Sequence, residues 1–415
     1  MFDPERIRQN DLRGGTPPWS QRLVQTRRPS VDRDFRCEIL VVGAGITGAL
    51  VAQHLVAQGH EVCIVDRQRP GFGSTAASTS MLMWEIDRSL SELTQMYGFE
   101  RAANIYRRSF TAVSGLAELV NTHRLACGLR HRRSLYLAAG NVGARELKAE
   151  HDLRMRAGFP GDYLDHLTLL DEFGLYRESA IHSIGSADAD PLLLCQALLD
   201  MTKAQGGNIF DASVENYDNS GQAVVAELDN GHLIEAKHVV LATGYVMPEF
   251  VASSLHKISS SWAIATPPQP SGATWRDGAL IWEASENYSY ARTTRDNRII
   301  MGGEDDDQVT EPDERDRLMP AKADALLHRL NGLWSDAEPV AEFVWSGTFG
   351  TTTDGLPLIG RVPGHPRIHA AYGYGGNGIT YSYLASRMIA ASIAGNHQSW
   401  FNDFAIDRDP PKIAA

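Results

Sequence analysis

The chain has 415 residues, 43% of them hydrophobic and 22% charged, a composition typical of a globular protein large enough for two domains. Its formal net charge of −12 excludes the basic face that a nucleic-acid partner requires. No apolar run is long enough to span a bilayer, and the charged N-terminus lacks the apolar core of a signal peptide. We therefore expect a cytoplasmic protein without a transmembrane segment.

Helix and strand signals alternate along the chain. A polar arm with several prolines covers residues 1–35, and apolar runs at 37–43 and 61–66 predict two strands. The residues between these strands predict a helix at 46–58, which ends at a glycine. Because further elements follow in the same interleaved order, we expect an α/β fold. They are a helix at 98–123, a strand at 134–140, a helix at 191–207, a strand at 238–245, a hairpin at 288–303 and a helix over 381–395.

A glycine motif stands between the first two strands. The run ILVVGAGITGALVAQHLVAQGHEVCIVD (39–66) has the order strand, Gly-x-Gly-x-x-Gly, helix, strand and acid. Gly43 permits a tight turn, Gly45 lets backbone N–H groups approach a pyrophosphate, and Gly48 allows close helix packing. Asp66 stands where a carboxylate accepts hydrogen bonds from a ribose. The run predicts dinucleotide binding, but by itself it does not separate FAD from NAD.

Later segments of the chain help to choose between FAD and NAD. Residues 67–87 are rich in small and hydroxyl side chains, which suit phosphates and a ribityl chain. LATGY (241–245) is a strand that ends in a glycine turn, and DGLPLIG (354–360) precedes a second glycine cluster, GYGGNGIT (373–380). A glycine cluster at the start of a helix lets the backbone come close to a ligand.

Together these segments resemble the D-amino acid oxidase-like family of FAD-dependent oxidoreductases, which includes glycine oxidase, sarcosine oxidase and amine-oxidising relatives. The resemblance covers about 37–398. It implies an extended FAD with its ADP end on the first glycine cluster and its flavin ring near the second, where a helix N-terminus faces the N1–C2=O edge. The FAD-binding residues that it implies are Gly43, Gly45, Ile46, Thr47, Gly48, Asp66, Arg67, Ser74, Thr75, Ala77, Ser78, Val214, Thr243, Gly244, Gly376, Asn377, Gly378, Ile379 and Thr380.

The resemblance also implies a Rossmann-type FAD-binding domain that is discontinuous in sequence, and a β-sheet substrate domain over the flavin. The first would comprise residues 36–86, 186–262 and 345–398. The second would comprise residues 87–185 and 263–344. The N-terminal arm (1–35) and a C-terminal tail (399–415) would lie outside both.

The expected substrate site differs from that of amino-acid-oxidising relatives. Such relatives hold the substrate carboxylate with Arg or Lys. At the matching positions this chain has Thr348 or Phe349, Gly376 and Thr380. We therefore expect an amine whose reacting carbon carries no free carboxylate. The opposing possibility is a relocated clamp from Arg292, Arg107 or Arg108. The candidate substrate residues are Tyr288, Tyr290, Arg292, Glu304 or its acidic neighbours in GGEDDD (302–307), and Phe349.

The resemblance implies oxidation of a C–N bond by hydride transfer to flavin N5, followed by hydrolysis of the imine, with O₂ or another electron acceptor as partner. We assign no catalytic side chain and expect no metal site, because the four cysteines fall in no metal-binding spacing. FAD should be noncovalent, since the two segments where relatives attach it lack Cys and His. Two alternatives remain: a flavoprotein that only scaffolds or passes electrons, and an NAD-dependent Rossmann dehydrogenase.

Overall fold

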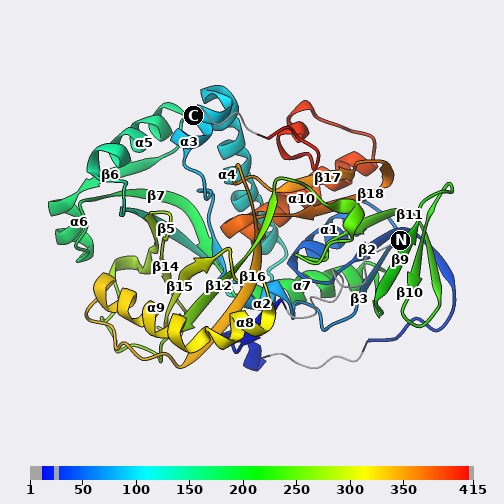
Figure 1. The fold of residues 1–415 in the computed structure, drawn as a ribbon, viewed down its shortest axis with the longest axis horizontal. Coiled ribbons are helices and arrows are strands. Elements are labelled where there is room, and N and C mark those ends of the chain that lie inside the picture. Colours follow the sequence, from blue (N-terminus) through cyan, green and yellow to red (C-terminus); the bar gives the residue numbers. More distant parts are fainter. Residues whose placement is uncertain (1–11, 23–27, 411–415) are drawn as a thin grey trace.

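The computed structural model describes residues 12–22 and 28–410, which form two sheets set side by side (Figure 1). One sheet has eight strands and contains the predicted dinucleotide-binding unit. The other has ten strands and forms the second half of the molecule. This arrangement confirms the predicted α/β class with two sheet-based halves.

The eight-stranded sheet begins with the predicted unit: β2 (Phe35–Val42), α1 (Ile46–Ala57) and β3 (Val62–Asp66). Parallel pairing joins β2 to β3 on one side and to β11 (Leu233–Leu241) on the other. The central residues of these strands are buried, as expected for parallel strands covered on both faces. The strand order is β17-β18-β11-β2-β3-β8, with β10 and β9 continuing from β11. The remaining bounds are β8 (Asn208–Asp211), β9 (Val214–Asp218), β10 (Val224–Leu228), β17 (Leu358–Val362) and β18 (His365–Tyr372).

The ten-stranded sheet has the order β1-β16-β12-β15-β14-β13-β5-β7-β4, with β6 paired to β7. It contains the predicted hairpin, in which β14 and β15 pair antiparallel. Its strands are β1 (Arg13–Gly15), β4 (Met81–Leu82), β5 (Arg130–Ala138), β6 (Gly161–Asp165), β7 (Ser179–Asp188), β12 (His256–Ala265), β13 (Leu280–Ala284), β14 (Tyr290–Thr293), β15 (Ile299–Asp306) and β16 (Phe343–Thr352).

Helices cover both sheets. The long predicted helix is α4 (Phe99–Thr122), and the predicted helix with proline in its first turn is α7 (Pro191–Ala204). The late apolar helix is α10 (Gly378–Ile393), which packs on α1 and α4. The other helices are α2 (Ser74–Ala77), α3 (Leu90–Tyr97), α5 (Ala144–Arg156), α6 (His166–Phe173), α8 (Pro312–Arg317) and α9 (Met319–Leu333).

Strands β7, β12 and β16 cross the predicted domain boundaries. Most of β12 and β16 falls in the segments predicted for the FAD-binding domain, yet both strands pair with each other inside the ten-stranded sheet. Their sequence gives no sign of this, because a strand signal does not name its partner strand. The division into domains stays a prediction. The sheet membership of β12 favours an end of the segment 186–262 that lies earlier in the chain, and that of β16 favours a later start of the segment 345–398.

The predicted arm is partly described. Its strand β1 adds antiparallel to β16, and η2 (Pro18–Arg22) follows as a 3₁₀ turn. At the other end, η6 (Ser399–Phe404) belongs to the predicted tail. Beyond it, the Arg408 guanidinium donates to both carboxylate oxygens of Asp354, at 2.7 and 2.8 Å. Residues 1–11, 23–27 and 411–415 of these two segments lie outside the described residues.

Candidate active site

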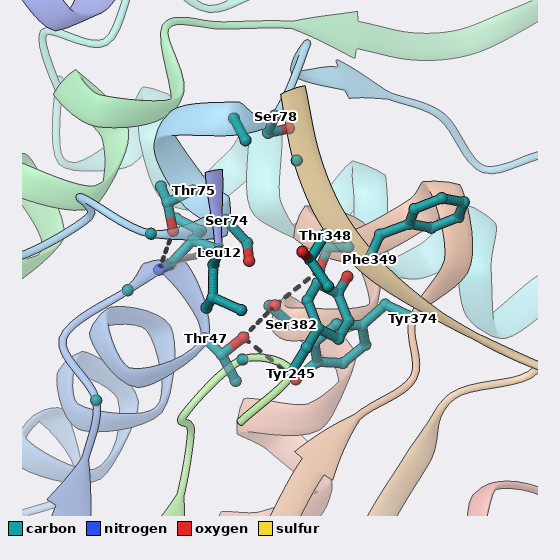
Figure 2. Close-up of a pocket in the computed structure, with 18 of the residues that line it drawn as sticks. Leu12, Thr47, Ser74, Thr75, Ser78, Tyr245, Thr348, Phe349, Tyr374 and Ser382 are labelled. Carbon is teal, nitrogen blue, oxygen red and sulfur yellow. Dashed lines mark hydrogen bonds between the residues drawn. The ribbon is translucent and has the colours of Figure 1, made fainter. Parts of the chain in front are cut away.

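A single cavity reaches both glycine clusters. Its lining comes from the ends of β2, β3 and β11, from α2 and the residues around it, from β16, and from the turn before α10. Figure 2 shows side chains from these elements pointing into the shared space. The two clusters, more than 300 residues apart in sequence, therefore belong to one site.

The first cluster leaves helix amides open to the cavity. Helix α1 begins after Gly45, which provides no side-chain cap, and of its first-turn N–H groups that of Ile46 donates to Thr75 Oγ1. Such a helix start suits a phosphate, as at phosphate-binding helix termini. Gly43 has φ +105°, and a Cβ there would lie 2.3 Å from the Ala242 carbonyl oxygen. A Cβ at Gly48 would lie 1.8 Å from the Gly43 oxygen. Gly48 is thus required for helix packing rather than for lining the cavity.

Asp66 ends β3 at the same end of the cavity. One of its carboxylate oxygens accepts from the Ala44 amide at 2.7 Å and the other from the Gln68 amide at 2.7 Å. Burial raises the pKa of Asp66, while these two amides and the nearby Arg28 and Arg67 oppose the rise. A carboxylate fixed by two backbone amides has further lone pairs for the hydroxyls of a ribose.

Hydroxyl groups line the middle of the cavity. Thr75 accepts a hydrogen bond from the Ile46 amide at 2.9 Å, which ties α2 to α1. Ser74 Oγ is buried and has no hydrogen-bond partner among the described residues. Thr47 bonds to Ser382 at 2.8 Å, as the dashed lines in Figure 2 show. An orphaned hydroxyl beside uncapped helix starts fits an extended, phosphate-containing cofactor.

The second cluster forms η5 (Gly375–Asn377) and the start of α10, which has no side-chain cap. The Asn377 amide group donates to the carbonyls of Met83 and Glu85, at 3.0 and 2.8 Å. A Cβ at Gly375 would lie 2.0 Å from Asp87 Oδ2, so this turn also requires glycine. The cluster therefore presents a second open helix N-terminus to the cavity, held against the segment that ends at Asp87.

The structure brings most of the predicted site residues to this cavity. Thr380 and Gly48 do not line it, because the Thr380 hydroxyl donates to the Met83 carbonyl at 2.9 Å and Gly48 packs against the turn at Gly43. The predicted residues in the lining are Gly43, Gly45, Ile46, Thr47, Asp66, Arg67, Ser74, Thr75, Ala77, Ser78, Val214, Thr243, Gly244, Tyr288, Tyr290, Phe349, Gly376, Asn377, Gly378 and Ile379.

The end of the cavity near the second cluster is aromatic and acidic. Tyr288 and Tyr290 stand with ring centroids 5.9 Å apart, and Trp282 lines the wall nearby. Asp87 and Asp305 also line the cavity. Burial raises the pKa of Asp305 to about 6, and the nearby Asp87 carboxyl adds to the rise. Burial also raises the pKa of Asp87, against the Gly376 amide and Arg88.

Two predicted substrate residues lie outside the lining. Arg292 is 3% exposed and forms a buried ion pair with Asp188 at 3.4 Å. Glu304 forms ion pairs with Arg329 and Lys322. Their side chains are thus engaged in ion pairs away from the cavity, and the acidic neighbour Asp305 takes the place expected for Glu304.

The other arginines considered as substitute clamps for a substrate carboxylate also have partners outside the cavity. Arg107 donates to the Ala157 carbonyl at 3.0 Å, and the Arg108 guanidinium lies 4.3 Å from the Trp400 ring centroid. Arg315 donates to the Thr348 hydroxyl at 2.8 Å without itself lining the cavity. Within the described part of the chain, the basic residues that line the cavity are Arg67 and Arg69, both beside Asp66.

Sequence reasoning did not single out several lining residues, among them Asp87, Trp282 and Tyr374. Asp87 is the last residue of the segment 67–87, whose composition suits phosphates and a ribityl chain, and this position is the sign in the sequence that it could lie near the cofactor. Tyr374 lies within the second glycine cluster and bonds to the Thr47 hydroxyl at 3.2 Å. Trp282 is on β13, whose apolar run gave no sign that this side faces a cavity.

The family model for FAD dependent oxidoreductases (DAO) matches residues 38–392. The chain belongs to this family. Members of this family depend on FAD, and both glycine clusters fit that cofactor. This finding decides against the NAD interpretation of the first motif. Within the described residues, no helix combines the length and apolar character needed to cross a membrane.

Similar proteins include amine and amino-acid oxidoreductases. The chain is 25% identical to the gamma-glutamylputrescine oxidoreductase of Escherichia coli (strain K12) over 389 residues, which cover 91% of this chain and 88% of that protein. It is 23% identical to a glycine oxidase of Bacillus licheniformis, over 90% of this chain and 98% of that protein. The crystal structure of glycine oxidase from Geobacillus kaustophilus has the same fold, with a TM-score of 0.77, 22% identity and coverage of 90% of this chain and 99% of that one.

Proposed function

We propose that this FAD-dependent oxidoreductase oxidises the C–N bond of an amine whose reacting carbon carries no free carboxylate. The observation that carries the proposal is the composition of the cavity near the second glycine cluster. It has several aromatic side chains, the carboxyl groups of Asp87 and Asp305, and no basic residue among the described lining there. A third acidic residue of the lining, Glu85, accepts hydrogen bonds at its carboxylate from Ser134 and Ser186. A buried substrate carboxylate without a cation would cost several kcal/mol, by order of magnitude.

When bound, FAD supplies a hydride acceptor at flavin N5. As the C–H bond beside the amine nitrogen breaks and its hydrogen leaves as hydride, the nitrogen lone pair would form the C=N bond. The resulting iminium cation would then release its N–H proton to water to give the imine. Water then adds to the imine carbon, and the adduct splits into a carbonyl compound and an amine or ammonia. The amine enters in its neutral form, because a protonated nitrogen has no lone pair to form the C=N bond.

The chain's own residues would bind the cofactor and orient the substrate. The N-terminus of α10, with the amides of Gly378 and Ile379, suits the N1–C2=O edge of the flavin. The third amide expected there, that of Asn377, donates to the Tyr374 carbonyl at 3.3 Å. Tyr288, Tyr290 and Phe349 offer an apolar, aromatic wall for the substrate's carbon chain. Tyr288 keeps its proton at neutral pH, because burial, with the Asp87 and Asp305 carboxyls, raises the pKa of its hydroxyl well above the usual value. It can therefore donate a hydrogen bond.

The two carboxylates would recognise a second, distant positive charge on the substrate. A diamine or a polyamine with one neutral reacting nitrogen and one ammonium group fits this arrangement. A relative at 25% identity is named for gamma-glutamylputrescine, a diamine acylated at one nitrogen, which is consistent with a reacting carbon free of carboxylate. Within the acidic run 302–307, Asp305 rather than Glu304 would bind the distant positive charge of the substrate.

FAD would be held without a covalent bond. Within residues 12–22 and 28–410, no Cys or His side chain lines the cavity, so neither of the usual attachment groups is at hand. Asp66 would bind the adenosine ribose, Val214 would meet the adenine, and the amides around Gly45 would meet the pyrophosphate. These assignments follow the family resemblance and agree with the lining of the cavity.

A screen of anaerobic flavin reduction tests the proposal. Putrescine, spermidine and N-acylated diamines are compared with glycine, sarcosine and D-alanine, watching the loss of visible flavin absorbance. Reduction by amines supports the proposal, and faster reduction by the amino acids overturns it. Bleaching by neither class would favour a flavoprotein that scaffolds or passes electrons. Air added to the reduced protein then tells O₂ from another acceptor by the rate at which the colour returns.

A further inference from the structure

The N-terminal arm reaches the cavity. Leu12 belongs to the lining, and Figure 2 shows its side chain between Ser74 and Thr47. A Cβ added at either Gly73 or Gly244 would lie 3.4 Å from Leu12 Cδ1. Leu12 therefore lies against both the segment before α2 and the turn after β11. The first of these belongs to residues 67–87, whose small and hydroxyl side chains suit phosphates and a ribityl chain.

The arm is anchored to the ten-stranded sheet on one side. Leu12 accepts a hydrogen bond at its carbonyl from the Thr348 amide at 2.9 Å. β1 then pairs antiparallel with β16, and the Gly14 amide donates to the Ser346 hydroxyl at 3.1 Å. A Cβ at Gly14 would lie 2.1 Å from Asp316 Oδ1, so the arm lies flush against the protein there.

The arm is anchored to the segment around α2 on its other side. Arg13 donates to the Phe72 carbonyl at 2.6 Å, and its guanidinium lies 3.9 Å from the Phe72 ring centroid. Trp19 is 4% exposed, donates to the Ala76 carbonyl at 2.6 Å, and packs edge-on against Trp345 with ring centroids 6.0 Å apart. The arm thus joins the sheet of one half to the loop that lines the middle of the cavity.

We propose that Leu12 forms part of one wall of the FAD site and closes the cavity over the middle of the cofactor, and that residues 13–19 hold it there. The family resemblance implies an FAD that extends from the first glycine cluster to the second, and the hydroxyl-rich segment that Leu12 touches at Gly73 lines the cavity between them. An apolar side chain at this position removes water from the cofactor's middle and must move before the cofactor can leave. By linkage, FAD and the docked arm then stabilise each other. The proposal rests on FAD binding alone and not on the identity of the substrate.

The rate of FAD release tests the proposal. The variants are Leu12→Ala, which removes the closing side chain, and Arg13→Ala, which removes the contacts to Phe72. Arg36→Ala is the control, because Arg36 is exposed and pairs only with Glu235 among the contacts described for it. Release is followed by the return of free flavin fluorescence after dilution of the holoprotein. We expect Leu12→Ala to release FAD about tenfold faster, which corresponds to about 1.4 kcal/mol, and the control to match the parent.

Limited trypsin digestion gives a second measurement that does not depend on a variant. Cleavage after Arg13, mapped by mass spectrometry, is compared between the holoprotein and the same protein stripped of FAD. The proposal expects slower cleavage when FAD is bound. Equal release rates for Leu12→Ala and Arg36→Ala, or equal cleavage with and without FAD, would overturn it. A failure to oxidise amines would leave both measurements intact, so the two proposals fail separately.

Discussion

The Asp87 carboxylate accepts a hydrogen bond of 2.8 Å from the Gly376 amide. This bond joins the end of the segment 67–87 to the second glycine cluster, and it fixes a carboxyl group beside the start of α10. Gly376 is one of the positions where amino-acid-oxidising relatives carry a cation. In this chain a carboxyl group lies at that position, where the family resemblance to amino-acid oxidases would predict a cation.

Replacing either cavity carboxylate should weaken the use of substrates with two amino groups. We expect Asp87→Asn and Asp305→Asn each to lower kcat/KM for such a substrate by roughly 10-fold to 100-fold, because a hydrogen bond to a charged group contributes about 1.5–3 kcal/mol. Asp307→Asn is the matched control, since Asp307 is exposed in the same acidic run and does not line the cavity. Steady-state kinetics with a diamine and a simple monoamine would reveal the difference. A loss of the same size for both substrates would argue against charge recognition.

The pH dependence of kcat/KM should reflect the ionisation of the Asp305 carboxyl group. Its pKa of about 6 means that the carboxyl is neutral below pH 6 and ionised above it. We therefore expect kcat/KM for a substrate with a second ammonium group to rise through about pH 6, and Asp305→Asn to lose that rise. Because this pKa lies above the ordinary 3.8, ionisation disfavours folding, and the free energy of unfolding should fall as the pH rises from about 4 to about 6. A pH profile that keeps its limb near 6 in Asp305→Asn would assign the limb to another group.

Gly45→Val should yield protein without FAD. A side chain at Gly45 would enter the space beside the uncapped start of α1, and its Cβ would already lie 3.2 Å from Thr75 Oγ1. Gly332→Val is the control, because a Cβ there meets nothing within 4 Å. The ratio of visible to ultraviolet absorbance of the purified proteins measures the cofactor content. A full yellow complement in Gly45→Val would refute this placement of the pyrophosphate.

FAD should separate from the protein on acid precipitation. No Cys or His lines the cavity in the described part of the chain, so the colour should remain in the supernatant. The absorbance of pellet and supernatant is compared after centrifugation. Colour that stays in the pellet would mean a covalent bond to a residue that the lining does not suggest.

Arg292→Ala should change stability and not specificity. Arg292 and Asp188 are 3% and 1% exposed, but Asp188 also pairs with Arg130 and Arg132. Because Asp188 keeps these partners, loss of Arg292 should cost about 2 kcal/mol, less than an unpaired buried charge would. Thermal unfolding should show this loss, whereas Arg36→Ala should cost less than about 1 kcal/mol. The ratio of kcat/KM for amines to that for amino acids should stay unchanged. A shift of this ratio toward amines would restore Arg292 as a carboxylate clamp.

The sequence predicted the cofactor half of the site better than the substrate half. The first motif carries its own context, because strand, glycines, helix and Asp66 are contiguous and each has a local physical reason. The contacts between distant segments, such as Asp87 with Gly376, leave no local pattern. The role of Arg292 could not be predicted for the same reason. An arginine on a strand looks the same in the sequence whether its side chain faces a cavity or pairs with Asp188. Glu304 and Asp305 differ only in which of two adjacent positions faces the cavity.

The most direct test of the central claim is a comparison of anaerobic flavin reduction rates for matched pairs of substrates. Each pair differs only by the carboxylate on the reacting carbon, as with sarcosine and dimethylamine or D-alanine and ethylamine, with a diamine as a third arm. The account predicts that removal of the carboxylate speeds reduction and that a second ammonium group speeds it further. Faster reduction by the amino acid of each pair, with Asp87→Asn and Asp305→Asn unchanged, would contradict it.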